Sequence, residues 1–251
     1  MLIFGIIGTK TPSLLLRRHN FKGVFDVSEK QKSFCFLEWG KDSALACYDA
    51  IKNEKVKIAY LLNMLSENGT HSRSHHLSVA MLKAQAEAMS IPIVQRQAAW
   101  GGYEEEFKKA LVVFKEEEIQ AGVFGDIDVQ EHRDWVERVC SESGLKAVLP
   151  LWQRSRESLM DEFIAAGFKA VIVAVKFECM GSEWLGRELD AQFVMDMKRI
   201  PQVDLCGENG EYHTFVYDGP IFKQPVVFAI GEKILKDKHC FLELKTKNGT
   251  L

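Results

Sequence analysis

The stretch FLEWGKDSALA, residues 36–46, joins the end of a β-type run to the start of a helical pattern. The run covers residues 33–37, and apolar side chains recur at helical spacing through residues 42–52. Residues 56–62 are rich in β-type residues again. The sequence therefore predicts a βαβ unit, with residues 38–43 in the connection between its first strand and its helix.

The same alternation continues outward from this unit. It predicts strands at 91–94, 121–125, 146–149 and 169–175, and helices at 76–89, 103–118, 129–140 and 156–166. Strands separated by helices of this length predict an α/β fold with a mostly parallel, Rossmann-like sheet and helices on both faces. Because ligands bind such sheets beyond the carboxyl ends of the strands, we expect chemistry in the loops after Leu37, Leu62, Gly125 and Val175.

The alternation weakens after residue 175, and Pro150 and Trp152 mark the expected change of domain. Residues 226–245 predict two further strands around 231–238, within a smaller C-terminal α/β region. We predict three parts: an N-terminal extension of uncertain role at 1–31, an α/β domain at 32–150 and a C-terminal region at 151–251.

The composition and net charge disfavour some classes of binding partner and favour one cellular compartment. The chain carries 32 Lys and Arg against 35 Asp and Glu, a net charge of −3, so no overall basic field would hold nucleic acid. The six cysteines form no CxxC pair, which favours reduced, buried thiols in a cytoplasmic protein over a disulfide framework or a zinc site. No apolar run approaches the roughly 18 residues that span a bilayer, so no membrane partner is expected.

The connection at 38–43 has features of a phosphate-binding loop. A loop between a strand and a helix directs backbone N–H groups and the positive end of the helix at the space above it. Gly40 permits close backbone approach, Lys41 adds a positive charge and Ser43 a hydroxyl. The spacing of a Walker loop is missing. A plain helix cap is the alternative to a phosphate site.

A second polar stretch, GVFGDIDVQEHRDW at 122–135, ends a predicted strand and opens a helix. Asp126 follows the strand, and Glu131 and His132 lie in the first turn of the helix. Acidic residues there are often only partners of the helix dipole. Because this loop lies at the same edge of the predicted sheet as the connection at 38–43, we also expect it near a ligand.

The stretch CGENGEYHTFVYDGP, residues 206–220, concentrates titratable groups on a turn-rich backbone. Glu208, Glu211, His213 and Thr214 accompany several glycines, so a tight turn would hold many polar groups together. A hairpin with polar decoration around an Asn-Gly turn is the alternative. We favour a ligand or substrate site.

The histidine-rich stretch HSRSHHL, residues 71–77, suggests a metal site at first sight. However, no Cys or carboxylate stands nearby at the spacing of metal ligands, so no metal site is predicted. We expect Arg73 to contact an anion instead.

Taken in order, these stretches make the chain resemble the diphthine–ammonia ligase family, a branch of the PP-loop (N-type) ATP pyrophosphatases. The resemblance covers about residues 33–222 and rests most specifically on GENGEYHTFVYDGPIF at 207–222. PP-loop enzymes carry a loop of the S-G-G-x-D-S type, and this chain keeps Gly40, Asp42 and Ser43 of it. Supporting segments are QAEAMSIP at 85–92, GDI at 125–127, PLW at 150–152, EFIAAGFKAVIV at 162–173 and LGRELD at 185–190.

The resemblance implies a HUP-type fold and an ATP-dependent amide ligase. A substrate carboxylate would be adenylated, with ATP giving AMP and pyrophosphate, and ammonia would then displace AMP. In the family the carboxylate belongs to diphthine on translation elongation factor 2. The resemblance also implies ATP and Mg²⁺ as cofactors, a PP-loop nucleotide-binding domain at 32–150 and a substrate-binding region at 151–251.

The resemblance assigns roles to individual residues. The implied catalytic residues are Lys41, Asp42, Glu208, Glu211 and His213. The implied cofactor-binding residues are Gly40, Lys41, Asp42, Ser43, Arg73, Gly125, Asp126 and Leu62, which marks a hydrophobic edge for adenine. The implied substrate-binding residues are Glu131, Arg187, Asp190, Gly207, Asn209, Gly210 and Thr214.

The loop departs from the family pattern at its first two positions, where Glu38 replaces Ser and Trp39 replaces Gly. A carboxylate facing pyrophosphate costs on the order of a kcal/mol, and Trp does not adopt positive-φ conformations cheaply. One alternative is therefore a nucleotide-binding or regulatory homologue that has lost catalysis. Another is a tRNA-modifying PP-loop enzyme, which the missing catalytic cysteine pair and the acidic net charge disfavour.

Overall fold

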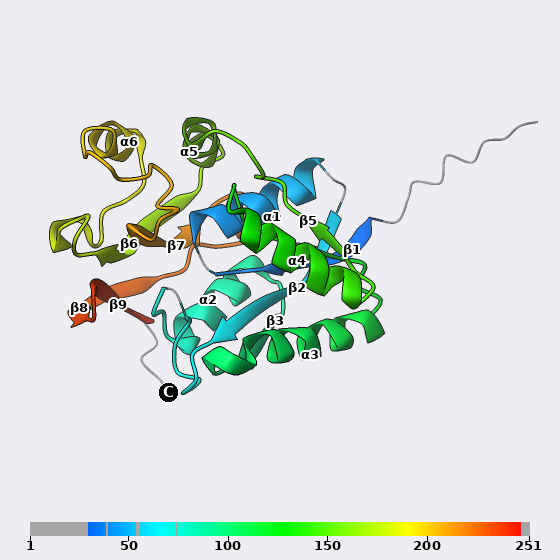
Figure 1. Ribbon diagram of the computed structural model, residues 1–251. Helices are drawn as coiled ribbons and strands as arrows, with labels where there is room; N and C mark the ends of the chain where they lie inside the picture. The colour runs from blue at the N-terminus through cyan, green and yellow to red at the C-terminus, as the bar shows by residue number, and fades with distance from the viewer. Residues whose placement is uncertain (1–29, 39, 54–55, 74, 247–251) are drawn as a thin grey trace, which may run out of the picture.

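The computed structural model describes residues 30–38, 40–53, 56–73 and 75–246, which form two β-sheets and their covering helices (Figure 1). The strands are β1 (Gln31–Phe36), β2 (Val56–Leu65), β3 (Ile93–Gln97), β4 (Ala121–Val123), β5 (Lys146–Val148), β6 (Lys169–Lys176), β7 (Tyr212–Asp218), β8 (Phe228–Lys236) and β9 (His239–Thr246). The α-helices are α1 (Lys41–Asn53), α2 (Val79–Met89), α3 (Tyr103–Glu116), α4 (Gln130–Glu142), α5 (Arg156–Ala165) and α6 (Ala191–Met197). Short 3₁₀ turns lie at Trp100–Gly102 and Ser182–Trp184.

The first sheet is parallel and has the strand order β3-β2-β1-β4-β5. Its central strand β1 sends alternate side chains to opposite faces, so Cys35 packs with residues of α1 and α2, whereas Phe34 packs with residues of α3 and α4. Helices therefore cover both faces, and the predicted Rossmann-like α/β fold is confirmed.

The second sheet is antiparallel and has the order β7-β6-β9-β8. The helices α5 and α6 lie along its outer side (Figure 1). A single hydrophobic core runs from α1 and α2 of the first half into β6, β7 and β9 of the second. The two sheets are thus held together by packed side chains.

Three local expectations differ from the structure. The strand at 169–176 belongs to the antiparallel sheet, so the loop after Val175 does not join the other loops beyond the parallel strands. The helix expected from residue 76 begins at Val79, because the hydroxyl of Ser78 caps it by accepting a hydrogen bond from the Met81 N–H. β2 continues to Leu65, which places Leu62 inside the strand rather than at its end.

Five of the six cysteines are buried, and Cys179 is half-buried. Within the described ranges, no helix is long and apolar enough to cross a membrane. Of the predicted extension at 1–31, residues 1–29 lie outside the described residues, and Gln31 already begins β1.

Candidate active site

The candidate site lies where the strand order of the parallel sheet reverses. β1 and β4 are neighbours, but α1 covers one face of the sheet and α4 the other, so a crevice opens at the carboxyl ends of these strands. Residues 40–43 follow β1, and Gly125 and Asp126 follow β4. A Cβ on Gly125 would lie 2.8 Å from the backbone N of Ser43, so the two connections pack directly against each other.

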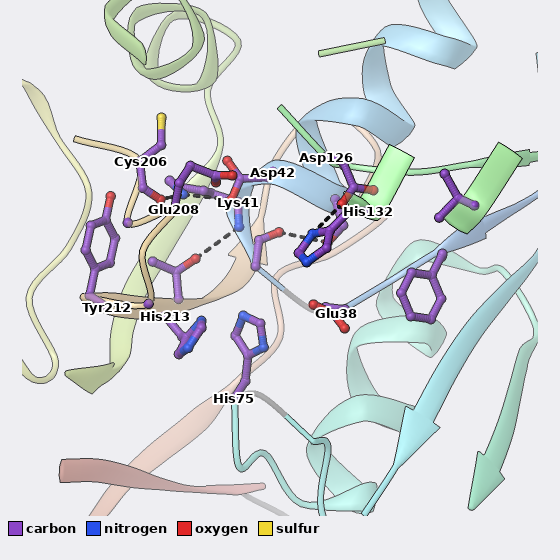
Figure 2. A pocket seen from close by; sticks show the side chains of 18 of the residues that line it. Glu38, Lys41, Asp42, His75, Asp126, His132, Cys206, Glu208, Tyr212 and His213 are labelled. Carbon is purple, nitrogen blue, oxygen red and sulfur yellow. Dashed lines mark hydrogen bonds and ion pairs between the residues drawn. The ribbon is translucent and has the colours of Figure 1, made fainter. Parts of the chain in front are cut away.

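A cavity of about 480 Å³ opens above these connections, and both halves of the chain line it (Figure 2). The first half contributes the loops after β1 and β4 and parts of α3 and α4, while the second contributes residues 206–214. The lining residues are Phe36, Glu38, Gly40, Lys41, Asp42, Ser43, His75, Tyr103, Gly125, Asp126, His132, Trp135, Val136, Cys206, Gly207, Glu208, Gly210, Tyr212, His213 and Thr214.

Lys41 joins the two halves at the floor of the cavity. Its backbone N–H donates to Oγ1 of Thr214 at 3.0 Å, so a hydroxyl from β7 caps the first turn of α1. Its buried Nζ lies 2.7 Å from Oδ2 of Asp42 and also donates to the carbonyl of Cys206. Burial opposes the charge of this ammonium, but Asp42, Tyr212 and Cys206 together outweigh burial and raise the pKa of Lys41. The ammonium is therefore charged and already paired within the protein.

Four carboxylates surround the cavity: Glu38, Asp42, Asp126 and Glu208. Water reaches Glu38 through the cavity, while protein encloses its other sides, and this enclosure together with the charge of Asp126 raises the pKa of Glu38 to about 7. Burial, followed by the charge of Asp42, raises the pKa of Glu208 to about 7 as well. Both groups are partly protonated near neutral pH, and cations at this site would favour their ionised forms.

Two neutral imidazoles face each other beside the loop, His75 from the segment before α2 and His213 from β7 (Figure 2). Their ring centres are 4.6 Å apart. Burial, the neighbouring His213 and Lys41 hold the pKa of His75 well below its usual range. Burial and Lys41 lower the pKa of His213 to about 4. Nδ1 of His75 has no hydrogen-bond partner among the described residues.

Gly40 makes room for one of these imidazoles. A Cβ at this position would lie 2.9 Å from Nε2 of His75 and 3.5 Å from Oγ1 of Thr214. The histidine on the opposite wall, His132, is different, because its Nδ1 lies 3.2 Å from Oδ1 of Asp126 and this contact raises its pKa. The cavity thus has two neutral imidazoles on one side and, on the other, an imidazole that contacts a carboxylate.

The end of the cavity toward α3 and α4 is aromatic. Phe36, Tyr103 and Trp135 line it, with the ring centres of Tyr103 and Trp135 5.7 Å apart. The guanidinium of Arg73 lies 5.4 Å from the centre of the Tyr103 ring, and its Nη1 donates to the carbonyl of Ala98. A cavity with an apolar end and a polar loop suits a ligand that has a flat ring and a charged tail.

Comparison with known proteins matches both halves of the chain to one family. Residues 31–147 match the diphthamide synthase N-terminal domain, and residues 155–249 match the diphthamide synthase C-terminal domain. The Bos taurus and Homo sapiens proteins named diphthine–ammonia ligase are each 30% identical over 233 residues, covering 82% of this chain and 85% of theirs. The chain belongs to the diphthine–ammonia ligase family.

The resemblance inferred from the sequence is thereby confirmed. The Mus musculus diphthine–ammonia ligase is 30% identical over 175 residues, which cover 62% of this chain and 65% of the mouse protein. The match thus spans just under two thirds of the length of this relative.

The cavity brings together most of the residues that the family resemblance singled out. From the loops of the parallel sheet it gathers Gly40, Lys41, Asp42, Ser43, Gly125 and Asp126. From the C-terminal half it gathers Gly207, Glu208, Gly210, His213 and Thr214. Segments more than 160 residues apart in the sequence therefore line the same cavity. The hydrogen bond between Lys41 and Thr214 joins two of them directly.

Other predicted site residues lie outside the lining. Leu62 is fully buried in the core beneath α3 and α4 and does not line the cavity. Glu211 is buried and accepts the backbone N–H groups of Asp204 and Asn209 at 2.8 and 2.9 Å, which positions the turn that carries Glu208. Arg73 lies 5.4 Å from the centre of the Tyr103 ring and is not among the lining residues.

The remaining predictions fall at a distance from the cavity or on its rim. Arg187 pairs with Asp196 and lies 4.8 Å from the centre of the Trp184 ring, and Asp190 caps α6 through the Phe193 N–H. Asn209 bonds Glu211, and Glu131 is exposed in the first turn of α4. Within the described ranges, no group of three or more His, Cys, Asp or Glu side chains is placed to hold a metal ion.

Sequence reasoning predicted His213 but missed His75, His132 and the aromatic end of the cavity. His75 and His132 stand in stretches that did attract notice, but nothing in their spacing shows that they face the loop at residue 40. Tyr103 and Trp135 fit helical periodicity and read as core residues. Trp39, the second departure from the loop pattern, lies outside the described residues.

Proposed function

We propose that the protein is an ATP-dependent amide ligase that adenylates a substrate carboxylate and then transfers it to ammonia. A carboxylate oxygen of the acceptor attacks the α-phosphorus of ATP and pyrophosphate leaves. Ammonia then attacks the carbonyl carbon of the acyl-adenylate, and AMP leaves with that oxygen. The observation that carries the proposal is the single cavity formed by the loop at 40–43, the β4 connection and residues 206–214.

In the proposed complex, the triphosphate lies at the polar end of the cavity and the adenine at its aromatic end. The triphosphate lies over the N-terminal turn of α1, where the helix dipole and the backbone N–H groups favour negative charge. The adenine then extends toward Phe36, Tyr103 and Trp135, which replace the edge near Leu62 that the sequence suggested. Lys41 serves mainly to fix the loop, because its ammonium is held by Asp42 and Cys206.

Magnesium fits the chemistry of the donor set. Mg²⁺ is usually bound through one or two carboxylates together with substrate phosphates rather than by a complete cage of side chains. Asp42 supplies carboxylate oxygens at the loop, and the triphosphate would supply further oxygens. Bound Mg²⁺ neutralises triphosphate charge.

Residues 206–214 face the reacting end of the nucleotide. Glu208 accepts the proton that the attacking nitrogen loses, a role suited to a carboxyl whose pKa is about 7. The neutral His213 orients the acceptor carboxylate or the incoming ammonia by hydrogen bonding. The family resemblance points to diphthine on elongation factor 2 as the acceptor.

A nucleotide-binding homologue without catalysis is the second candidate, and Glu38 favours it. Its carboxylate adds negative charge beside Asp126 where the family loop has Ser. The pKa of about 7 moderates this conflict, because a fraction of Glu38 is neutral at physiological pH.

The test is the fate of labelled oxygen. We would incubate the protein with Mg-ATP, ammonium and acceptors whose carboxylates carry ¹⁸O, including elongation factor 2 bearing diphthine. Adenylation predicts AMP that contains one acceptor oxygen, with at least a hundredfold loss in Asp42→Asn and no loss in the exposed control Asp161→Asn. Absence of AMP with every acceptor, together with ATP binding gained only in Glu38→Ser/Trp39→Gly, would reject the active ligase.

A further inference from the structure

The strand β8 is an edge with no partner on its outer side in the described part of the chain. It pairs with β9 along one side and ends the order β7-β6-β9-β8. Figure 1 places it at one end of the molecule, away from the helices of the parallel sheet. At nine residues it is long for an edge strand, and beyond the β-bulge that interrupts its pairing with β9 it offers a row of backbone donors and acceptors to another strand.

Exposed apolar side chains gather on this same edge. Four of the eight large apolar residues that are exposed in the described chain lie on β8 or just before it, namely Val227, Ile230, Ile234 and Leu235. Ile230 and Leu235 are 62% and 67% exposed. Such a concentration on an open strand is typical of an interaction surface rather than of solvent-facing decoration.

The charges on β8 favour a second copy of this chain as the binding partner. A β-bulge lies between Ile230 and Lys233, and beyond it Glu232, Ile234 and Lys236 alternate and share one face. Glu232 and Lys236 form no ion pair within the described chain. If a second β8 lies antiparallel about Ile234, Glu232 of each protomer faces Lys236 of its partner, giving two opposite-charge pairs around an apolar centre.

Pairing the two strands in a neighbouring register is less favourable. Centring the pair on Lys233 would place two lysines opposite each other, which is unfavourable. Centring it on Leu235 would require Asp237 and Lys238 to pair, but the strand ends at Lys236 and Asp237 has a φ of +53° in the following turn. Of these three registers, the one centred on Ile234 is the most favourable.

We propose that two copies of this chain associate through β8, antiparallel about Ile234, so that their antiparallel sheets become one continuous sheet. The contact lies apart from the cavity and does not depend on the proposed reaction. It joins the molecules by backbone hydrogen bonds, by apolar contacts of Ile234 and by the two charge pairs.

The test uses charge exchange at low salt, with mass measured by light scattering or sedimentation equilibrium. The native chain is expected at twice 28.5 kDa. Glu232→Lys or Lys236→Glu alone creates two like-charge pairs and should raise the dissociation constant about tenfold or more. The double variant should restore the dimer, and a mixture of the two single variants should form a heterodimer.

Lys238→Glu is the matched control, because it makes the same charge change in the turn beyond the paired strand and should leave the dimer intact. A monomeric native chain would overturn the proposal. So would a dimer that both single variants leave unchanged, or a loss that the double variant fails to restore while its thermal unfolding remains native.

Discussion

The two walls of the cavity are positioned by different kinds of interaction. The connections after β1 and β4 meet because parallel strands end at the same edge of a sheet, so topology alone brings them together. Residues 206–214 arrive from an antiparallel sheet, and contacts such as that between Lys41 and Thr214 hold them in place. One side of the site is therefore built by the fold and the other by side-chain contacts across the two halves.

The largest effect is expected from removing Lys41, the side chain that connects the two halves of the chain. Lys41→Met deletes a buried cation and leaves Asp42 and the Cys206 carbonyl without it, so we expect destabilisation by about 3 kcal/mol in urea unfolding. Lys52→Met in the same helix is the control, because Lys52 is exposed and should change stability by less than about 0.5 kcal/mol. Equal effects of the two substitutions would show that Lys41 does not join the halves.

A second comparison sets a contact with backbone on the parallel side against a contact with a side chain from the segment before α2. In Gly125→Ala the new Cβ would meet backbone atoms of Asp42 and Ser43 at 2.8–2.9 Å, so we expect a loss of about 2 kcal/mol and weaker ATP binding. In Gly40→Ala the obstacle is the His75 side chain, which can move, so we expect less than about 1 kcal/mol. Unfolding curves and titration calorimetry with Mg-ATP would measure both, and the reverse ranking would contradict this account.

The smallest expected effect concerns Glu208 and pH. The pKa of Glu208 is about 7 in the folded protein, above its value of 4.5 when unfolded. The stabilisation linked to its proton is therefore complete below about pH 4.5 and is lost as the pH rises through 7. Without ligand, Glu208→Gln should be about 1 kcal/mol more stable than the native protein at pH 8 and equal to it near pH 4.5.

Thermal and urea unfolding across this pH range would measure the difference. Glu131→Gln, an exposed substitution outside the cavity, serves as the control and should run parallel to the native curve. A constant offset of Glu208→Gln at every pH would argue that packing, not ionisation, separates the variants.

The parts of the fold that could be predicted are those with a local signal. The loop at 40–43 and Gly125 follow from strand and helix periodicity together with the rule that ligands bind beyond strand ends. The strand at 169–176 was wrongly expected in the parallel sheet. A fully buried apolar run has the same pattern in a parallel and an antiparallel sheet. The place of Leu62 within its strand could not be predicted either, because the pattern does not show that β2 continues to Leu65.

The rest of the site depends on contacts that no local pattern encodes. Glu208 and Glu211 are three residues apart in one motif, yet one faces the cavity and the other is buried beneath the turn, accepting backbone N–H groups. His75 joins His213 only because the segment before α2 folds back over Gly40. Which of several polar residues in a motif touches a ligand is decided by tertiary packing.

The cap that Thr214 places on α1 also affects how the protein acquires its site during synthesis. The ribosome completes the loop at 40–43 long before it reaches β7, and the two meet across 173 positions of chain. A nascent chain that ends at β5 has the loop at 40–43 but neither the capping hydroxyl nor the wall formed by residues 206–214. The complete pocket is therefore assembled only after the C-terminal half has been made, so unfinished chains do not carry it.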